Sequence, residues 1–462
     1  MDELEASQVA PDTVMRDNWV IAAVGIATIC LFGTVVAIGI GWRNSEQAVA
    51  PGGSGARVTV EVTLGDLFVK PASIKVPSGS PVTFVVTNIG AMPHDFAVNG
   101  TKGTRMIEPG GKATLEAPAF TASTKAWCTV PGHKAAMTMD INVIGDSSNS
   151  EGNGSDTEVA ASGAKIDPNE MPAVDWKPYD PALKPAPGGT EHKISLAAVE
   201  TKVEVAPGVE QMRWTFNGKV SGPTLRGKLG DIFTVTLTNK GKIGHSIDFH
   251  ASKVAPNVEM KTLQPGESIV YQFTANFAGI WMYHCGTAPA LDHIGNGMFG
   301  AVIIDPPNLA TVDHEFVMVQ SELYLGPNGE PGDSTKMQKE QFDAVVFNGY
   351  YNQYKFQPIR VEPGQRVRVW VLDAGPSENS SFHIVGTIFD TIFKEGTIIL
   401  RPDDRRGGAQ SLDLQPSQGG YVEFSLDQAG MFPMVTHKFA NVGKGALGLF
   451  QAGDVEPPAA GH

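Results

Sequence analysis

Two of the three cysteines in the sequence stand beside histidines and methionines at spacings that suit copper. Cys128 opens the run Cys-Thr-Val-Pro-Gly-His-Lys-Ala-Ala-Met, so His133 and Met137 share its loop, and His94 lies upstream at the end of a strand-like run. A thiolate and two imidazoles in a plane, with a long axial thioether, form a blue-copper electron-transfer site. We predict that such a site is formed by His94, Cys128, His133 and Met137. Met139 is the rival axial ligand, and Met137 is preferred on loop length.

A second and richer group of the same residue types follows later in the chain. Its members are His245, Asp248, His250, His284, Cys285, His293 and Met298. Four of them repeat the blue-copper set, and these are His245, Cys285, His293 and Met298. One carboxylate and two imidazoles are left over.

Strand geometry indicates where the leftover side chains point. Successive side chains of a strand face opposite sides, so Cys285 and the adjacent His284 are opposed. If His245 and Cys285 point into a sandwich to hold one copper, Asp248, His250 and His284 point outward together. Two imidazoles and a carboxylate make a partial metal site that needs another ligand.

The last third of the chain contains no cysteine, so it cannot build a blue-copper site. It offers His383 in Ser-Ser-Phe-His-Ile-Val-Gly and His437 in Met-Phe-Pro-Met-Val-Thr-His, each in a strand-like run. The outward face that carries Asp248, His250 and His284 must be covered by another part of the protein. The last third of a neighbouring subunit is a candidate.

The elements that position these residues are expected to be short strands. The 52 glycines, the 32 prolines and the short runs of Val, Thr and Phe favour an all-β, sandwich architecture. Phe-Asn-Gly occurs at 216–218 and again at 347–349, and the Asn88–His94 spacing equals the Asn239–His245 spacing. We predict three related β-sandwich domains, at 57–145, 190–306 and 307–455.

An apolar run precedes these domains. Residues 19–42 carry no charge and are long enough to cross a bilayer as one transmembrane helix, after an N-terminal tail at 1–18. We expect an uncleaved single-pass anchor in the cell membrane, with the copper domains on the extracytoplasmic side. Residues 146–189 form a linker, and its Pro-rich end at 166–189 is expected to extend against the domain that follows. The net charge of −14 excludes nucleic acid as a partner, because phosphates would be repelled.

Residues 190–455 resemble the copper-containing, nitric-oxide-forming nitrite reductases. The shared motifs are His-Ser-Ile-Asp-Phe-His at 245–250, Tyr-His-Cys at 283–285, His-x4-Met at 293–298, Phe-Asn-Gly at 347–349, His-Ile-Val-Gly at 383–386 and Thr-His at 436–437. The resemblance assigns the type 1 copper to His245, Cys285, His293 and Met298, and the catalytic type 2 copper to His250, His284 and His437. It makes Asp248 and His383 the acid–base pair and places Val385 at an apolar position over the copper. Ile388 stands where well-studied members have a second histidine.

Residues 57–145 resemble a single-domain cupredoxin of the azurin or plastocyanin kind. Together the two resemblances imply three cupredoxin-like Greek-key sandwiches that hold two type 1 coppers and one type 2 copper per chain. They also imply a homotrimer that reduces nitrite, with the fused cupredoxin as an electron relay. A small cytochrome or a cupredoxin is expected to supply the electron.

Two alternative functions are a laccase-like oxidase and a non-catalytic electron carrier. A laccase-like oxidase needs paired His-x-His motifs for a trinuclear cluster, and the sequence contains none. A non-catalytic electron carrier built from several cupredoxins would lack a type 2 copper, whereas this chain retains Asp248, His250, His284, His383 and His437.

Overall fold

The computed structural model of the chain describes residues 57–66, 68–130, 133–134, 137–144, 163–402 and 407–455. The tail at 1–18, the predicted helix at 19–42 and the first part of the linker lie outside these residues. Among the residues described, no helix is long and apolar enough to cross a membrane.

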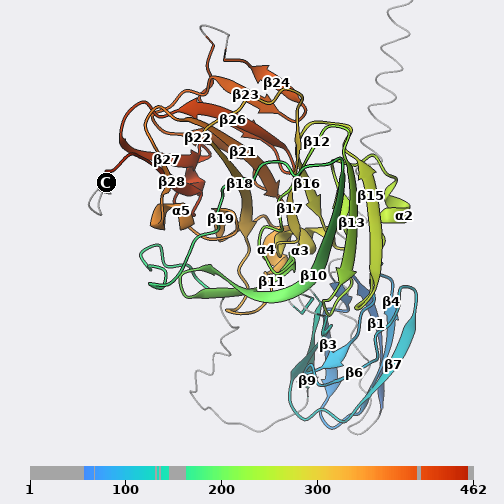
Figure 1. The fold of residues 1–462 in the computed structure, drawn as a ribbon. Coiled ribbons are helices and arrows are strands. Elements are labelled where there is room, and N and C mark those ends of the chain that lie inside the picture. Colours follow the sequence, from blue (N-terminus) through green and yellow to red (C-terminus); the bar gives the residue numbers. More distant parts are fainter. Residues whose placement is uncertain are drawn as a thin grey trace, which may run out of the picture.

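The regular secondary structure of the described residues is mostly strand, and the strands form six sheets (Figure 1). The expectation of a mostly β fold is confirmed. Alternating burial explains why these segments are strands: in Val82–Asn88 and Ile232–Asn239 every second residue, mostly β-branched or aromatic, is buried.

The first two sheets, called here the first sheet pair, are drawn from residues 58–144. Their orders are β2-β1-β4-β7 and β3-β9-β8-β5-β6. The strands are β1 (Val58–Gly65), β2 (Phe68–Lys70), β3 (Ser73–Pro77), β4 (Val82–Asn88), β5 (Ala97–Val98), β6 (Lys102–Gly103), β7 (Lys112–Ala117), β8 (Thr124–Trp127) and β9 (Thr138–Ile144).

The second sheet pair is drawn from residues 191–305, with orders β11-β10-β13-β15 and β12-β17-β16-β14. Its elements are β10 (Glu191–Ala206), β11 (Val209–Phe216), β12 (Leu225–Lys228), β13 (Ile232–Asn239), β14 (Asp248–Phe249), α2 (Pro256–Glu259), β15 (Ser268–Thr274), β16 (Gly279–His284), α3 (Ala290–Gly295) and β17 (Phe299–Asp305).

The third sheet pair is drawn from residues 314–452, with orders β19-β18-β21-β26-β23-β24 and β20-β28-β27-β22-β25. Its elements are β18 (His314–Leu323), α4 (Ser334–Gln338), β19 (Ala344–Phe347), α5 (Gln353–Phe356), β20 (Ile359–Val361), β21 (Arg366–Gly375), β22 (Ser380–Ile384), β23 (Thr391–Lys394), β24 (Thr397–Leu400), β25 (Leu412–Leu414), β26 (Gly419–Ser425), β27 (Gly430–Thr436), η1 (Phe439–Asn441) and β28 (Leu447–Ala452).

The three pairs repeat one pairing pattern. The first long strand of each pair runs parallel to a later strand, as β1 with β4, β10 with β13 and β18 with β21. The opposite sheets repeat a second parallel pairing, as β3 with β9, β12 with β17 and β20 with β28. The sheet pairs match the residue ranges predicted from the sequence, while the division into domains stays a prediction.

The second and third sheet pairs pack against each other through buried apolar side chains. Ile280 and Met282 of β16 belong to the same buried cluster as Trp370 of β21 and Tyr421 of β26. Because side chains alternate along β16, the face that carries Ile280 and Met282 also carries His284 at the end of the strand. The outward histidine therefore lies at the end of this contact.

The Pro-rich segment differs from expectation in what it contacts. The segment is extended as expected, but its backbone pairs with the third sheet pair, whereas we expected it to lie against the second. Val317 N donates to Pro181 O and Leu183 N donates to Glu315 O, both at 2.9 Å. The Trp176 ring also packs on that of Tyr350, with centroids 4.7 Å apart. Because β19 pairs only with residues 320–323 of β18, the first half of β18 keeps one free edge, whose backbone groups a proline-rich chain can use on alternate residues.

Candidate metal centres

The first centre lies at one end of the first sheet pair, where the loop after β8 meets the loop before β5. Cys128 Sγ lies 3.8 Å from His94 Nδ1 and 3.7 Å from His133 Nδ1, and all three residues are buried. Met137 is also fully buried. The structure thus brings together all four residues predicted from the sequence.

The second centre repeats this arrangement in the second sheet pair. Cys285 Sγ lies 3.2 Å from His293 Nδ1, and His293 Nδ1 lies 3.3 Å from His245 Nδ1. Met298, on the loop that follows, is fully buried. Burial alone would raise the pKa of the Cys285 thiol, but His293 and His245 outweigh it and hold that pKa well below its ordinary value.

Backbone hydrogen bonds make Met137 the counterpart of Met298. Met298 N donates to His293 O at 3.0 Å, and Cys285 N donates to Met298 O at 3.0 Å. Met137 repeats both contacts, with His133 O at 2.8 Å and with Cys128 N at 3.2 Å. Met139 lies further along β9, opposite Ala126 of β8. The contacts support Met137 as the axial ligand.

Both centres carry a carboxylate that the sequence reasoning missed. Asp66 Oδ1 lies 3.2 Å from His94 Nε2, and Glu200 Oε1 lies 2.7 Å from His245 Nε2. A partner on the far ring nitrogen fixes the histidine tautomer and leaves Nδ1 free for a metal. The acid and its histidine show no common spacing in sequence, because the β10–β11 hairpin that separates Glu200 from β13 is much longer than its counterpart, the β1–β2 hairpin.

A third cluster lies on the outer side of the second sheet pair. Asp248, His250 and His284 each place a ligand atom within 4.8 Å of the others. His250 Nε2 lies 3.0 Å from His284 Nε2, and His284 Nδ1 donates to Cys285 O at 2.9 Å. That bond leaves His284 Nε2 free to face the cluster. Ile247 and Phe249, on either side of Asp248, are in the core, so the side chains alternate as predicted.

The remaining predicted residues lie together on the third sheet pair, apart from this cluster. His383 and His437 have ring centroids 5.1 Å apart, and His437 is exposed. His383 Nδ1 donates to the backbone oxygen of Gln410, which leaves Nε2 free. Val385 is 42% exposed and Ile388 is 64% exposed. Within the described part of one chain, His437 does not join His250 and His284.

The third sheet pair has the same corner as the two blue-copper centres, but with other side chains. Ser381 N donates to Thr436 Oγ1 at 2.9 Å, as Ser246 N donates to Cys285 Sγ at 3.3 Å. Ala446 N donates to Asn441 O at 3.0 Å, as Met298 N donates to His293 O. The positions of His245, Cys285, His293 and Met298 are therefore taken by Ser380, Thr436, Asn441 and Ala446. This corner has no copper-binding side chain.

The carboxylate of the corner is nevertheless retained as Glu322. It accepts from Ser377 N at 3.1 Å and Glu378 N at 3.2 Å, as Glu200 accepts from Lys242 N at 2.8 Å. Burial raises the pKa of Glu322 to about 7. Burial also acts on Glu200, but there the histidine partner His245 and the backbone bonds lower the pKa. The deeper burial of Glu322 and the missing histidine partner together account for the difference between the two acids.

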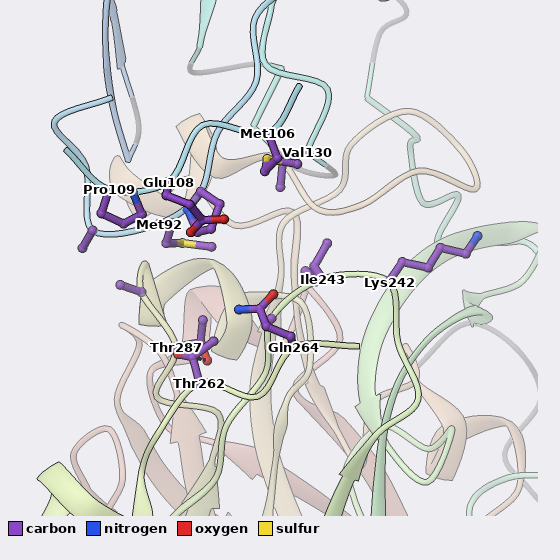
Figure 2. A pocket seen from close by; sticks show the side chains of 14 residues that line it. Met92, Met106, Glu108, Pro109, Val130, Lys242, Ile243, Thr262, Gln264 and Thr287 are labelled. Carbon is purple, nitrogen blue, oxygen red and sulfur yellow. Dashed lines mark hydrogen bonds between the residues drawn. The ribbon is translucent and has the colours of Figure 1, made fainter. Parts of the chain in front are cut away.

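The loops that carry the ligands of the first and second centres meet at the contact between their sheet pairs, where Figure 2 shows the side chains between them. A cavity of about 330 Å³ lies between the loops that carry the ligands. From the first pair it is lined by Met92, Pro93, Met106 and Val130 among others, and from the second by Ile243, Gly244, Thr287 and Ala288 among others. Burial, with smaller contributions from His94 and from His293 across the contact, lowers the pKa of His133 to about 3.

The donor sets suit copper at all three places. Three donors about 2 Å from a common centre in a trigonal plane are separated by roughly 3.5 Å, as the sulfur and nitrogen atoms of the blue-copper sets are. Sulfur with imidazole accommodates both oxidation states of copper, and the imidazole pair of the outer cluster suits copper(II). The outer cluster by itself has fewer imidazoles than the predicted type 2 site.

The comparisons with known proteins agree with this geometry. A family profile described as multicopper oxidase matches residues 197–309. The copper-containing nitrite reductase of Neisseria gonorrhoeae is 33% identical over 277 residues, which cover 58% of this chain and 69% of that protein.

Two solved structures are similar to more than half of this chain. A copper nitrite reductase from Nitrosomonas europaea has a TM-score of 0.52 and 32% identity, and the match covers 59% of this chain and 98% of that one. A copper-containing nitrite reductase from Thermus scotoductus has a TM-score of 0.52 and 29% identity, covering 58% of this chain and 63% of that one.

The raised pKa of Glu322 leads to a prediction about stability. The folded chain holds this proton more tightly than the unfolded chain, so stability is greatest below the ordinary glutamate pKa and is lost as pH rises toward about 7. Each pKa unit is about 1.4 kcal/mol, so the loss is on the order of 3 kcal/mol. Between pH 5 and pH 8, the unfolding temperature measured by calorimetry should fall less in Glu322→Gln than in the unmodified chain. Glu362→Gln, at an exposed position, is the control, and equal slopes in the two variants would contradict the assignment.

Proposed function

This chain belongs to the copper-containing nitrite reductase family and is a copper oxidoreductase, and from that premise we propose that it reduces nitrite to nitric oxide at a site shared between two copies of the chain. The observation that carries the proposal is the outer cluster of Asp248, His250 and His284, one residue away from the second blue-copper set. Because His284 and Cys285 are bonded neighbours, the two sites are joined by a short covalent path. An electron carrier has no need of the outer cluster.

Copper, when bound, supplies the one-electron couple and a coordination position for nitrite. Reduction of nitrite to nitric oxide takes up one electron and two protons and releases water. Asp248 lies beside the two imidazoles and has Tyr271 Oη 3.5 Å from its Oδ1, so it can hold bound nitrite and pass a proton. His383, with Nε2 free, is the second proton donor, and Val385 forms the apolar wall of the pocket.

We propose that the site is completed by His437 from a neighbouring subunit. Within one chain His437 and His383 form an exposed pair on the third sheet pair, whereas His250 and His284 lie on the second. Each exposed pair would be covered if the third sheet pair of one subunit lay on the second sheet pair of the next. A contact of this kind is heterologous and closes as a ring. The resemblance to the family supports a ring of three, with three coppers per chain, two of type 1 and one of type 2.

We propose further that the first sheet pair, as a separate cupredoxin domain, relays electrons to the second. The facing ligand loops across the shared cavity support this role (Figure 2). A tethered donor also acts at a high effective concentration. A small cytochrome or a cupredoxin would supply the first centre. The apolar run at 19–42 would anchor the chain in the cell membrane with these domains on the extracytoplasmic side.

The proton-donor roles can be tested by substitution. Asp248→Asn and His383→Ala should each lower nitrite turnover by roughly 10²-fold, the usual scale for a positioned acid–base group. Both variants should keep the type 2 signal in electron paramagnetic resonance, because neither residue is a proposed copper ligand. Ile388→Ala is the control and should change turnover little. Normal turnover in both variants would remove the proposed roles.

The shared site predicts complementation between two inactive chains. His437→Ala and His250→Ala should each lack type 2 copper when purified alone. Mixed trimers formed after subunit exchange should contain some sites with a complete ligand set, and type 2 copper and nitrite turnover should partly return. If the mixture stays inactive after exchange has been shown by mass spectrometry, His437 acts within its own chain.

The relay predicts a difference between electron donors. Cys128→Ala should remove one blue absorption band yet leave turnover with a small dye donor largely intact, because the dye can reach the second centre directly. Turnover with a reduced protein donor should fall strongly. Loss of dye-driven turnover would show that the first sheet pair does more than relay electrons.

A further inference from the structure

We propose that Asp95 and Arg213 make the two blue-copper centres electrostatically unequal, so that an electron shared between them resides mainly at the second. Asp95 would lower the reduction potential of the first centre, and Arg213 would raise that of the second. This inference rests on the proposed relay, since it gives the relay a direction. The two residues are positioning residues and touch no substrate.

Asp95 and Ser246 occupy the same place in the two centres, next to the first histidine ligand. Thr129 N donates to Asp95 Oδ1 at 2.6 Å, and Thr129 Oγ1 donates to the other carboxylate oxygen. Gly286 N donates to Ser246 Oγ at 3.0 Å in the same way. Each donor is the residue that follows the cysteine ligand. One centre therefore has a carboxylate beside its thiolate where the other has a neutral hydroxyl.

The difference in charge acts on whatever metal each centre binds, because Asp95 and Ser246 hold the backbone beside the cysteine ligand. A negative charge beside the sulfur favours the more positive oxidation state of a metal bound there.

Arg213 contributes a buried positive charge to the second centre. Its side chain is fully buried, and Nη1 donates to Gly295 O at 3.2 Å and to Gln211 Oε1 at 2.7 Å. Among the described residues, Nε and Nη2 have no hydrogen-bond partner and no carboxylate pairs with the guanidinium. Gly295 lies between His293 and Met298, and a Cβ on Gly297 would lie 2.9 Å from Nη2. Burial lowers the pKa of Arg213 to about 9, which keeps it charged at neutral pH.

Other charges near the two centres must be weighed against this pair. Asp66 and Glu200 are both paired with a histidine ligand, and the shorter Glu200 contact works against the proposed order. Asp292, next to His293, is a buried carboxylate that accepts from Ser334 Oγ at 2.6 Å, and it also works against that order. Lys134, next to His133, is exposed and lies over the Trp127 ring, where water screens it. We expect the combined effect of Asp95 and Arg213 to exceed that of Glu200 and Asp292.

The consequence is a downhill electron step between the centres. One electron leaves the first centre, which is oxidised, and reaches the second, which is reduced. No bond is formed or broken and no proton moves. Removal of the charge of either Asp95 or Arg213 should shift the sharing of that electron at least tenfold toward the first centre, which corresponds to about 59 mV for one electron.

The test is a potentiometric titration of each blue absorption band in the copper-loaded full chain. Cys285→Ala isolates the first centre and Cys128→Ala isolates the second. Added to Cys285→Ala, Asp95→Asn removes the charge at constant shape, and Asp95→Ser copies the second centre. Added to Cys128→Ala, Ser246→Asp makes the converse change and Arg213→Gln removes the buried cation. Lys193→Gln, at an exposed position of β10, is the matched control.

We expect the first centre to have the lower midpoint, both Asp95 variants to raise it, and Ser246→Asp and Arg213→Gln to lower the midpoint of the second. Equal or reversed midpoints, or a first midpoint that neither Asp95 variant changes, would overturn the proposal. If Arg213→Gln fails to fold, the Asp95 and Ser246 variants still decide. Rapid reduction of the first centre separates the two proposals. If the midpoints have the expected order but no electron passes from the first centre to the second, the unequal potentials are supported and the relay is contradicted.

Discussion

The alternation of side chains at the end of β16 is the constraint on which both proposed copper sites of the second sheet pair depend. A strand turns neighbouring residues to opposite faces, so Cys285 is directed into the core while His284 is directed outward. Each site must then be completed from its own side: the inner one by His245, His293 and Met298, and the outer one by Asp248 and His250. A shift of one residue in the pairing of β14 with β16 would exchange the two faces and destroy both sites together.

The second and third sheet pairs differ in which faces of this strand end carry metal-binding side chains. In the second pair both faces carry ligands. In the third, the inner corner has Ser380, Thr436, Asn441 and Ala446, and only the outer face keeps histidines. Ser381 is the counterpart of Ser246. His383 lies two residues after Ser381, as Asp248 lies two residues after Ser246. The proposed acid–base pair thus comes from equivalent positions of two related units, which explains how they could meet when one unit covers another.

The residues that gather at the two buried centres and in the outer cluster could be predicted from the sequence, because a copper site restricts both residue type and local spacing. Strand parity also separated the inner from the outer set correctly, since it depends only on neighbours in sequence. The carboxylates Asp66, Glu200 and Glu322 could not be found in this way, because their strands meet the ligand loops across an insertion of variable length. The path of the Pro-rich segment along β18 was missed for a related reason: its composition indicates an extended chain but does not select the edge it follows.

The cavity between the first and second sheet pairs makes part of their contact a hydrated one. Its volume of about 330 Å³ has room for several water molecules. Thr262, Gln264 and Thr287 supply polar partners for that water. Water that bridges two polar surfaces holds them together nearly as well as direct hydrogen bonds do, and it can be exchanged or rearranged. Small changes in how the two sheet pairs sit can therefore be taken up by water between the two proposed blue-copper centres.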